Sequence, residues 1–476
     1  MCLARGEERG GDACPQEDFS RNLPLKGQTP PLHFCRRKGS EPMILPAPLV
    51  ETAAALRTGQ LDLLTYINEI CDRIDAVEPQ IQALLPEANR RARLIAEAQA
   101  LQQHFPELAN RPPLFGIPVG IKDIFFVDGF ATRAGSQLPP ELFVGPEGDC
   151  VRTLRAAGAL ILGKTVTTEF AYFEPGPTRN PHNLHYSPGG SSSGSAAAVA
   201  AGYCPLAIGT QTIGSTIRPA AFCGIVGFKS SYGRIPMTGG ILCSETFDHV
   251  GIFTQDVTGM ELAASLLCQN WQAIETDVSA ALPIIGVPEG PYLAQASAEG
   301  LAAFEKQLAL LEKAGYTVRR VKTMEDIEAI NRRHSRLVFA EMAQGHTVWF
   351  EQYASLYRPR TAAAIHEGQA VSVEELATLR TSPAKLRAVL ETLMLQAGID
   401  LWICPSSLGP APEGITTTGS PLMNLPWTHA GMPAISLPAG RATNGLPLGL
   451  QCVGVFMADE RLLRWVATIA EVVKFV

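Results

Sequence analysis

Hydrophobic positions in the early part of the chain recur at helical spacing. Between Leu49 and His104 one apolar stripe consists of Leu61, Leu64, Ile67, Ile70, Cys71 and Ile74. This spacing is typical of one face of an amphipathic helix. A second helix is predicted from Glu87 to Gln103, after Pro86. Neither segment carries a cluster of reactive side chains, so we expect both to be scaffold.

From Gly116 onward, short apolar runs alternate with helical segments. The predicted strands are PVGIKDIFFV (118–127), LILGK (160–164), IGVP (285–288), TVRRV (317–321), LWICP (401–405), AISLPAG (434–440) and GLPLGLQCVGV (445–455). Helices are predicted over 151–157, 191–201 and 297–314, and residues 324–395 are mostly helical. The alternation predicts an α/β fold, a single large domain whose mixed β-sheet is covered by helices on both faces.

Residues 1–42 differ from the rest, because they are dense in glycine, proline and charge and show no periodicity. We predict a disordered N-terminal extension there and a folded domain over 43–476. The net charge of −7 gives no basic footprint for nucleic acid. No apolar run reaches the length of a membrane span and no signal peptide begins the chain, so we expect neither a membrane nor a nucleic-acid partner.

Eleven cysteines are spread along the chain without a CxxC pair. This pattern argues against a disulfide framework and a structural zinc site, and favours free thiols in the cytoplasm. The nine histidines also lack metal-ligand spacing, so we expect neither a metal nor another cofactor. Cys204 and Cys223 lie near the serine-rich stretch described next, where we expect buried packing roles for both.

Residues 187–236 are rich in glycine, serine and alanine, yet they alternate with apolar positions such as Val199, Ile208, Ile217 and Phe228. A flexible linker has no such apolar rows. The composition favours backbone packed closely against backbone, with hydroxyl and amide groups directed into a pocket. A nucleophilic serine and its oxyanion hole need that arrangement.

Three separated pieces carry a resemblance to the amidase signature family. They are GIPVGIKD (Gly116–Asp123), GGSSSGSAAAVAAG (Gly189–Gly202) and GTQTIGSTIRPAAFCGIVGFK (Gly209–Lys229). Weaker agreement extends from about Leu61 to the C-terminus. The resemblance implies an amidase domain over 43–476 with a Ser–cis-Ser–Lys triad, in which Ser215 matches the nucleophile, Ser191 the bridging serine and Lys122 the base. It also implies a cis peptide bond at Gly190–Ser191.

The apolar neighbours of Lys122 support a base, because burial disfavours the ammonium form and lowers the lysine pKa. The alternative is an ion pair between Lys122 and Asp123 or another carboxylate. For Ser191–Ser193, the alternative is that their hydroxyls cap the following helix. For Ser215, it is a turn serine bonded to its own backbone.

The resemblance places the oxyanion hole at the backbone N–H groups of Thr212, Ile213, Gly214 and Ser215. Three departures from the commonest motif stand here. Gln211 replaces Asp, Ile213 replaces Gly, and Arg218 lies three residues after the matched nucleophile rather than two. A variant of the signature, GTQT-x-GS-x-x-RPA, accommodates all three. We expect Arg218 to support the loop by hydrogen bonds to carbonyls or to a carboxylate.

Two competing motifs are weaker. GSSSG at Gly190–Gly194 matches GxSxG around Ser192, with Asp248 and His249 as potential partners, but no buried strand precedes it. GALILGKT at Gly158–Thr165 matches a phosphate-binding loop, yet its apolar interior is typical of a strand.

The function predicted is hydrolysis of a small-molecule carboxamide through an acyl-enzyme on Ser215. Alternatives are the glutaminase-type A subunit of a tRNA-dependent amidotransferase, a specialised member acting on an allophanate-like or indoleacetamide-like substrate, and a non-catalytic amidase-like binding protein. The GTQT variant argues against the amidotransferase role, because the glutaminase-type motif has Asp. The acyl pocket is expected near Tyr172–Phe173, 176–178, 324–395 and 416–427. A homodimer is compatible with the resemblance.

Overall fold

The sheet at the centre of the chain is ten-stranded and mixed in the computed structural model, which describes residues 42–273 and 282–473. Its strands are β1 (Pro118–Lys122), β2 (Leu160–Thr165), β3 (Leu206–Gln211), β4 (Val226–Lys229), β5 (His249–Thr254), β6 (Ile285–Glu289), β7 (Val318–Lys322), β8 (Leu401–Pro405), β9 (Ala434–Arg441) and β10 (Pro447–Val453). Their order across the sheet is β2-β1-β3-β5-β4-β9-β10-β8-β6-β7. The two ends of the sheet are parallel, whereas the pairs from β3 through β8 are antiparallel.

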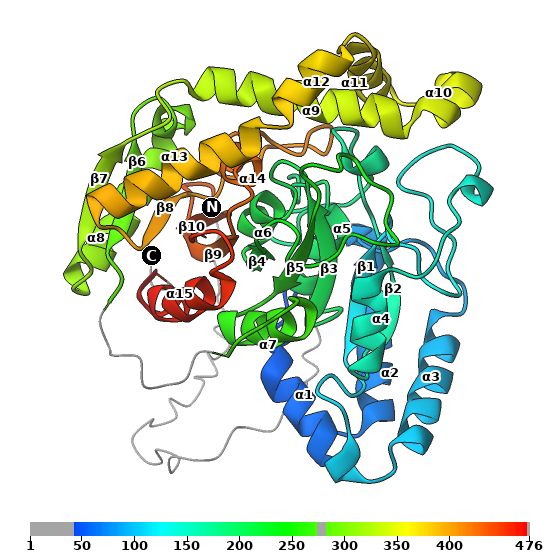
Figure 1. Ribbon diagram of the computed structural model, residues 1–476. Helices are drawn as coiled ribbons and strands as arrows, with labels where there is room; N and C mark the ends of the chain where they lie inside the picture. Colours follow the sequence, from blue (N-terminus) through cyan, green and yellow to red (C-terminus); the bar gives the residue numbers. More distant parts are fainter. Residues whose placement is uncertain (1–41, 274–281, 474–476) are drawn as a thin grey trace, which may run out of the picture. The chain divides into compact units, whose positions relative to one another are not determined.

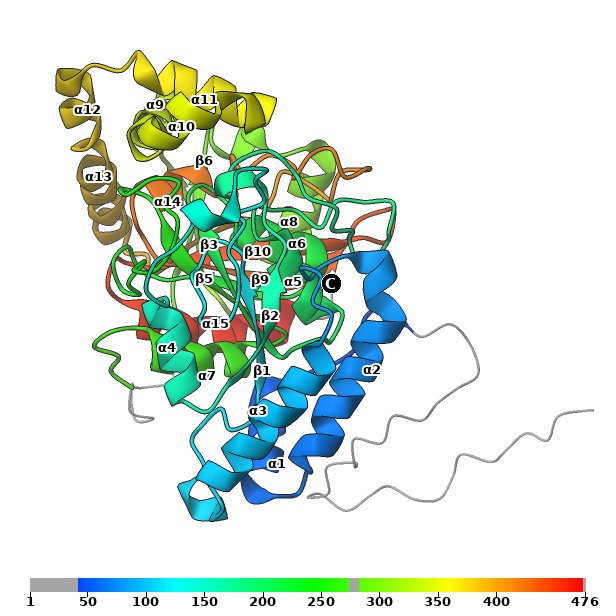
Figure 2. The ribbon, with the colours of Figure 1, turned by 90° about the vertical axis from the view of Figure 1, so that its right-hand side faces the viewer.

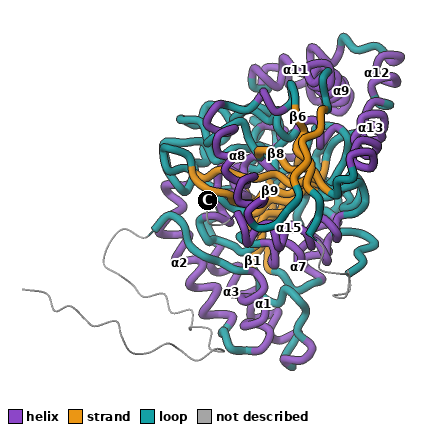
Figure 3. Tube along the Cα trace, turned by 90° about the vertical axis from the view of Figure 1, so that its left-hand side faces the viewer, coloured by secondary structure: helices purple, strands orange, loops and turns teal. Residues whose placement is uncertain are grey.

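Helices surround this sheet, as Figures 1 and 3 show. They are α1 (Leu49–Thr58), α2 (Leu63–Ile81), α3 (Arg90–His104), α4 (Asp149–Ala156), α5 (Ser193–Ala200), α6 (Ile217–Cys223), α7 (Val257–Leu267), α8 (Ala298–Lys313), α9 (Ile327–Gly345), α10 (Thr347–Tyr353), α11 (Pro359–Gln369), α12 (Val373–Leu379), α13 (Ser382–Ala397), α14 (Leu425–His429) and α15 (Asp459–Val473). Helices α5 and α6 pack on one face of the central strands, and α7 and α15 pack on the other.

Glycines on the central strands explain why short helices can lie so close to the sheet. A Cβ atom added to Gly227 of β4 would come within 2.5 Å of the Ala220 side chain, and one on Gly449 of β10 within 2.8 Å of Ala221. Real Cβ atoms do not make such contacts, so the strands carry glycine where α6 crosses them. This close approach positions α6 and the loop that enters it, which holds Ser215.

The sequence-based prediction of an α/β fold with helices on both faces is confirmed. Two strands are shorter than expected. The strand predicted over 445–455 spans 447–453, and β1 ends at Lys122, where the amides of Ile124 and Phe125 turn back to its carbonyl, at 2.8 and 3.1 Å. The apolar residues 124–127 therefore pack in a turn rather than in the sheet. The predicted disordered extension over 1–42 lies, except for its last residue, outside the described residues. Among the described helices, none is both long and apolar enough to cross a bilayer.

Helices α9–α13 form a group at one side of the sheet, seen at the top of Figure 2. Glu341 of α9 attaches this group to the loop before β5, since its carboxylate accepts hydrogen bonds from Ser244 Oγ at 2.6 Å and from the Thr246 amide at 2.9 Å. Arg380 Nε lies 2.9 Å from the same carboxylate. The predicted helical character of residues 324–395 is thus observed.

Candidate active site

Lys122, the last residue of β1, is fully buried at 0 % exposure. Its Nζ lies 2.7 Å from Ser191 Oγ and 2.7 Å from Thr210 Oγ1. Among the described residues no carboxylate lies within ion-pair distance of this amine. Asp123, the expected alternative partner, instead pairs with Lys164 of β2, at 2.8 Å. The sequence alternative in which Lys122 makes an ion pair is therefore wrong.

Burial governs the charge on Lys122. Loss of hydration lowers its pKa from 10.5 to about 7, and the nearby Asp248 carboxylate opposes this by favouring the ammonium form. At neutral pH, Lys122 is therefore a neutral amine in a large fraction of the molecules. A neutral amine has a lone pair that can accept a proton from a neighbouring hydroxyl.

Ser191 lies in the turn that leads into α5 and is 2 % exposed. The Gly190–Ser191 peptide bond is cis, as the resemblance implied. The Gly190 carbonyl accepts a hydrogen bond from Arg218 Nη2 at 2.6 Å, so Arg218 supports this turn through a carbonyl, as expected. Ser192 occupies the N-cap position of α5 without a side-chain capping bond, and its Oγ donates to the Thr210 carbonyl at 3.1 Å. The capping alternative is therefore not observed at Ser192.

Ser215 stands in the loop between β3 and α6. It lines a cavity of about 10 Å³ together with Ser191, Thr212, Ile213 and Gly214. All three predicted triad positions thus come together, since Lys122 touches Ser191 and Ser191 shares the cavity with Ser215. The backbone amides of residues 213–215 have no hydrogen-bond acceptor in the described part of the chain. They remain available to an anionic oxygen in the cavity.

Three further neighbours were not assigned to the site by sequence reasoning. Thr210 holds the Lys122 amine, and Cys243 lines the cavity. Asp248 accepts hydrogen bonds from Thr212 Oγ1 at 2.5 Å and from the Cys243 amide at 2.7 Å, and burial raises its pKa to about 6. Thr210 was visible within the GTQT motif, whereas Cys243 and Asp248 lie in the segment that leads into β5, the strand that pairs with β3.

The segments expected to shape the acyl pocket line more than one cavity. Tyr172, Phe173 and Pro421 line the serine cavity. Tyr172 and Phe173 also line a neighbouring groove of about 310 Å³, which the helical segment completes with Phe339, Arg360, Ala363, Ala364 and Glu367. The groove and the serine cavity therefore share two aromatic lining residues. Gly176 and Pro177 line a different cavity.

The competing motifs do not assemble. His249 Nδ1 donates to the Phe247 carbonyl at 2.6 Å, its Nε2 has no hydrogen-bond partner among the described residues, and Ser192 Oγ donates to the Thr210 carbonyl instead. Residues 160–165 of GALILGKT form β2, and no helix begins at Lys164. Cys204 and Cys223 are buried, and burial raises the pKa of both thiols. Neither is an activated nucleophile.

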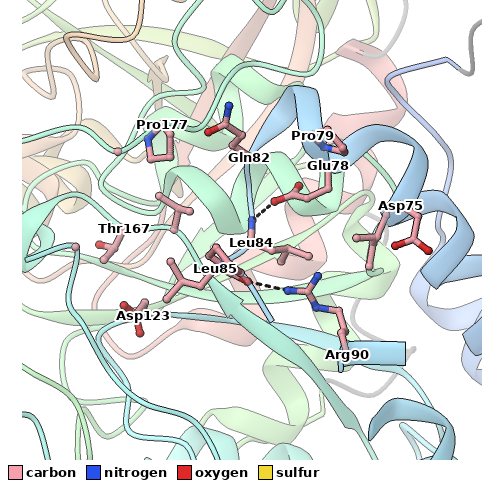
Figure 4. Close-up of a pocket in the computed structure, with 15 residues that line it drawn as sticks. Asp75, Glu78, Pro79, Gln82, Leu84, Leu85, Arg90, Asp123, Thr167 and Pro177 are labelled. Carbon is pink, nitrogen blue, oxygen red and sulfur yellow. Dashed lines mark hydrogen bonds between the residues drawn. The ribbon is translucent and has the colours of Figure 1, made fainter. Parts of the chain in front are cut away.

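A larger cavity of about 560 Å³ lies elsewhere, between α2 and the loops after β1 and β2 (Figure 4). Its lining includes Glu78, Leu84, Arg90 and Asp123 but none of the predicted triad residues. The Glu78 carboxylate accepts a hydrogen bond from the Leu84 amide at 2.6 Å, and Arg90 Nη2 donates one to the Leu85 carbonyl at 2.8 Å. The larger cavity therefore lacks the chemical groups found around Ser215.

Comparison with known sequences gives one consistent picture. The family model described as Amidase matches residues 65–463. The A subunit of glutamyl-tRNA(Gln) amidotransferase from Synechococcus sp. is 31 % identical, covering 87 % of this chain and 95 % of the relative. The protein of the same name from Oleidesulfovibrio alaskensis is 31 % identical, covering 89 % and 96 %.

Solved structures agree with the sequence comparison. A crystal structure described as an amidase superposes with a TM-score of 0.77 at 30 % identity, covering 89 % of this chain and 99 % of its own. A second structure comes from a vestigial protein complex that reveals the origins of an s-triazine catabolic enzyme. It gives a TM-score of 0.78 at 26 % identity, covering 89 % and 98 %.

Proposed function

Because the chain belongs to the amidase signature family, we propose that it hydrolyses the C–N bond of a small carboxamide through an acyl-enzyme on Ser215. The observation that carries the proposal is the position of the Lys122 amine. It is fully buried and 2.7 Å from Ser191 Oγ, and Ser191 shares a cavity with Ser215. This arrangement supports proton transfer from Ser215 through Ser191 to a neutral lysine.

In the proposed reaction, the Ser215 oxygen attacks the amide carbonyl while its proton passes to Ser191, whose own proton passes to Lys122. Collapse of the tetrahedral intermediate breaks the C–N bond, and Ser191 returns a proton to the leaving nitrogen. The free amides of residues 213–215 support an oxyanion hole, in line with the predicted set Thr212, Ile213, Gly214 and Ser215. Water then attacks the acyl-enzyme and gives its proton to Ser191, whose own proton passes to Lys122. The proton returns through Ser191 to the Ser215 oxygen as the acid is released.

The side chain of Arg218 bears on the choice of amide. Arg218 lines the serine cavity, is 1 % exposed, and has no carboxylate within ion-pair distance among the described residues. In that part of the chain its Nε and Nη1 have no hydrogen-bond partner, and burial lowers its pKa to about 9. A buried guanidinium with free donors favours an anionic or strongly accepting group. Within the proposed function, we therefore favour short amides that carry a carboxylate.

A second candidate comes from the relatives. The curated proteins reported above are named as amidotransferase A subunits, and this chain covers nearly their whole length. An analogous role would make this chain one component of a complex, releasing ammonia from glutamine for a partner protein. The Gln211 variant of the motif, in place of the Asp in the glutaminase-type motif, favours the free-standing amidase.

The test is ammonia release from a panel of amides, including glutamine, aliphatic and aromatic amides, indoleacetamide, allophanate and monoamides of dicarboxylic acids. Ser215→Ala is expected to lower turnover at least about a thousand-fold. Ser193→Ala is the matched control, because this buried serine lies two residues after Ser191 and its hydroxyl bonds, within the described part of the chain, only the Val166 carbonyl, at 3.3 Å. Turnover that survives Ser215→Ala would refute the nucleophile, and turnover restricted to glutamine would favour the amidotransferase role.

A further inference from the structure

The loop of residues 212–216 presents its amides and its carbonyls to different partners. The amides of residues 213–215 have no acceptor in the described chain, but the carbonyls of Ile213 and Gly214 do have donors. In a trans peptide unit, the carbonyl and the following N–H lie in one plane and point in opposite directions. A donor that holds a carbonyl away from the cavity therefore aims the next amide into it.

Thr428 is the donor to one of these carbonyls. Its Oγ1 donates to the Ile213 carbonyl at 2.7 Å, and the peptide unit that contains this carbonyl also contains the Gly214 amide. The Gly214 carbonyl accepts from the Arg218 amide at 3.0 Å, which orients the Ser215 amide in the same way. Thr428 belongs to α14 and is fully buried.

Gln211 determines which way the Thr428 hydroxyl points. The Gln211 Oε1 accepts from the backbone amides of Thr216 at 2.8 Å and Ile217 at 3.0 Å, so its Nε2 faces Thr428 and donates to Oγ1 at 2.9 Å. A hydroxyl has one hydrogen to give. Because Gln211 supplies a hydrogen to this oxygen, the hydroxyl hydrogen of Thr428 is free for a carbonyl. A second carbonyl, that of Asn424, lies farther away at 3.1 Å.

A carboxylate at position 211 would act differently. It could accept the same two backbone amides, but it has no hydrogen to donate. The Thr428 hydroxyl would then turn its hydrogen toward the carboxylate, and the Ile213 carbonyl would lose its donor. The glutamine and the threonine thus form one hydrogen-bond relay that needs both members.

We propose that Thr428 is a positioning residue that acts with Gln211 to aim the Gly214 amide at the oxygen of the tetrahedral intermediate. The inference rests on the proposed amidase function of Ser215. Neither residue has to touch substrate, since both act through the Ile213–Gly214 peptide unit. Loss of one oxyanion donor lowers kcat by about 100- to 1000-fold in other hydrolases, and a misdirected donor should cost less.

The test compares Thr428→Val, Thr428→Ser and Gln211→Glu with the wild type on the best amide of the panel. The valine and glutamate variants are expected to lose about 10- to 100-fold in kcat with KM changed less than about threefold. Thr428→Ser keeps the hydroxyl and is expected to stay within about threefold of the wild type. Gln211→Glu changes no volume, so it tests the relay even if valine impairs folding.

Binding of a boronic acid analogue of the substrate separates positioning from general damage. The boronate forms a tetrahedral adduct with a negative oxygen, whereas the product carboxylate does not. Thr428→Val is expected to weaken boronate binding at least about tenfold while product inhibition changes little. An active wild type whose variants keep full kcat and boronate affinity would overturn this inference alone. A wild type that neither hydrolyses an amide nor binds the boronate would overturn the proposed function and this inference together.

Discussion

Asp123 follows Lys122 directly in the chain, yet its carboxylate lies 2.8 Å from the Nζ of Lys164 on the neighbouring strand. The parallel register of β1 and β2 pairs Ile121 with Lys164, which places the second lysine beside the turn after β1. As a result, two buried lysines lie at neighbouring register positions of adjacent strands, and Asp123 makes an ion pair with Lys164 and not with Lys122. Lys122 is left with two hydroxyl groups.

Because Asp123 pairs with Lys164 and not with Lys122, replacing each lysine with methionine should change the free energy of unfolding in opposite directions. Lys122→Met should abolish activity and raise the free energy of unfolding by roughly 1–2 kcal/mol, because methionine loses no hydration on burial. Lys164→Met should lower it by roughly 3–5 kcal/mol, because Asp123 would remain buried without its cation. Chemical denaturation and amide turnover of both variants check the pair. Loss of stability in Lys122→Met would contradict the assignment.

The increase in the free energy of unfolding expected for Lys122→Met should depend on pH, and the sign of that dependence follows from the lysine pKa. The folded pKa of Lys122, about 7, is below the ordinary lysine value of about 10.4, so the unfolded chain binds an extra proton between these values. The wild type therefore gains stability from this group as pH rises from about 7 toward 10. The advantage of Lys122→Met should be largest at pH 7 and below and should shrink at higher pH, as denaturation at several pH values would show.

Activity should depend on the same proton. Below a pH of about 7 Lys122 is mostly protonated and cannot accept a proton, so kcat/KM should fall about tenfold for each unit of further acidification. The Asp248 carboxylate favours the ammonium form, hence Asp248→Asn should move this acid limb to lower pH. A pH profile from 5 to 9 for both proteins measures the shift. If the midpoint of the acid limb is unchanged in Asp248→Asn, Asp248 does not raise the pKa of Lys122.

The alternation of apolar runs predicted the mixed sheet and seven of its ten strands, but not β3, β4 and β5. Lys122, Ser191 and Ser215 were implied by the family resemblance that three motifs carry, and not by periodicity. Sequence reasoning could not find Thr428, which meets Gln211 across 217 positions of chain. It also could not pair Asp123 with Lys164, because that contact depends on the register of two strands. The periodicity of hydrophobic residues does not predict contacts that depend on strand register or on helix packing.

The close approach of α5 to its neighbours gives a test of the small-residue stretch. A Cβ atom on Gly194 would collide with the Ala83 carbonyl and the Val166 amide, both of them backbone groups that cannot rotate away. Gly194→Ala should therefore lower the free energy of unfolding by more than about 2 kcal/mol. Gly345→Ala is the control, because the added methyl at the end of α9 would meet no described atom within 4 Å outside its own helix, and it should be neutral or slightly stabilising. Equal thermal midpoints for the two variants would argue against close packing at α5.

The free donors of Arg218 predict a charge preference that substrates can report. Monoamides of short dicarboxylic acids should exceed neutral amides of the same length in kcat/KM by at least about tenfold, as expected for a charge-assisted hydrogen bond in a buried site. Arg218 also holds the Gly190 carbonyl, so Arg218→Met is expected to slow every substrate. The informative quantity is the ratio of kcat/KM for the anionic amide to that for the neutral amide. This ratio cancels the common damage and should fall toward one in Arg218→Met. A wild type that prefers neutral amides, or a ratio that survives the substitution, would show that the guanidinium serves the loop alone.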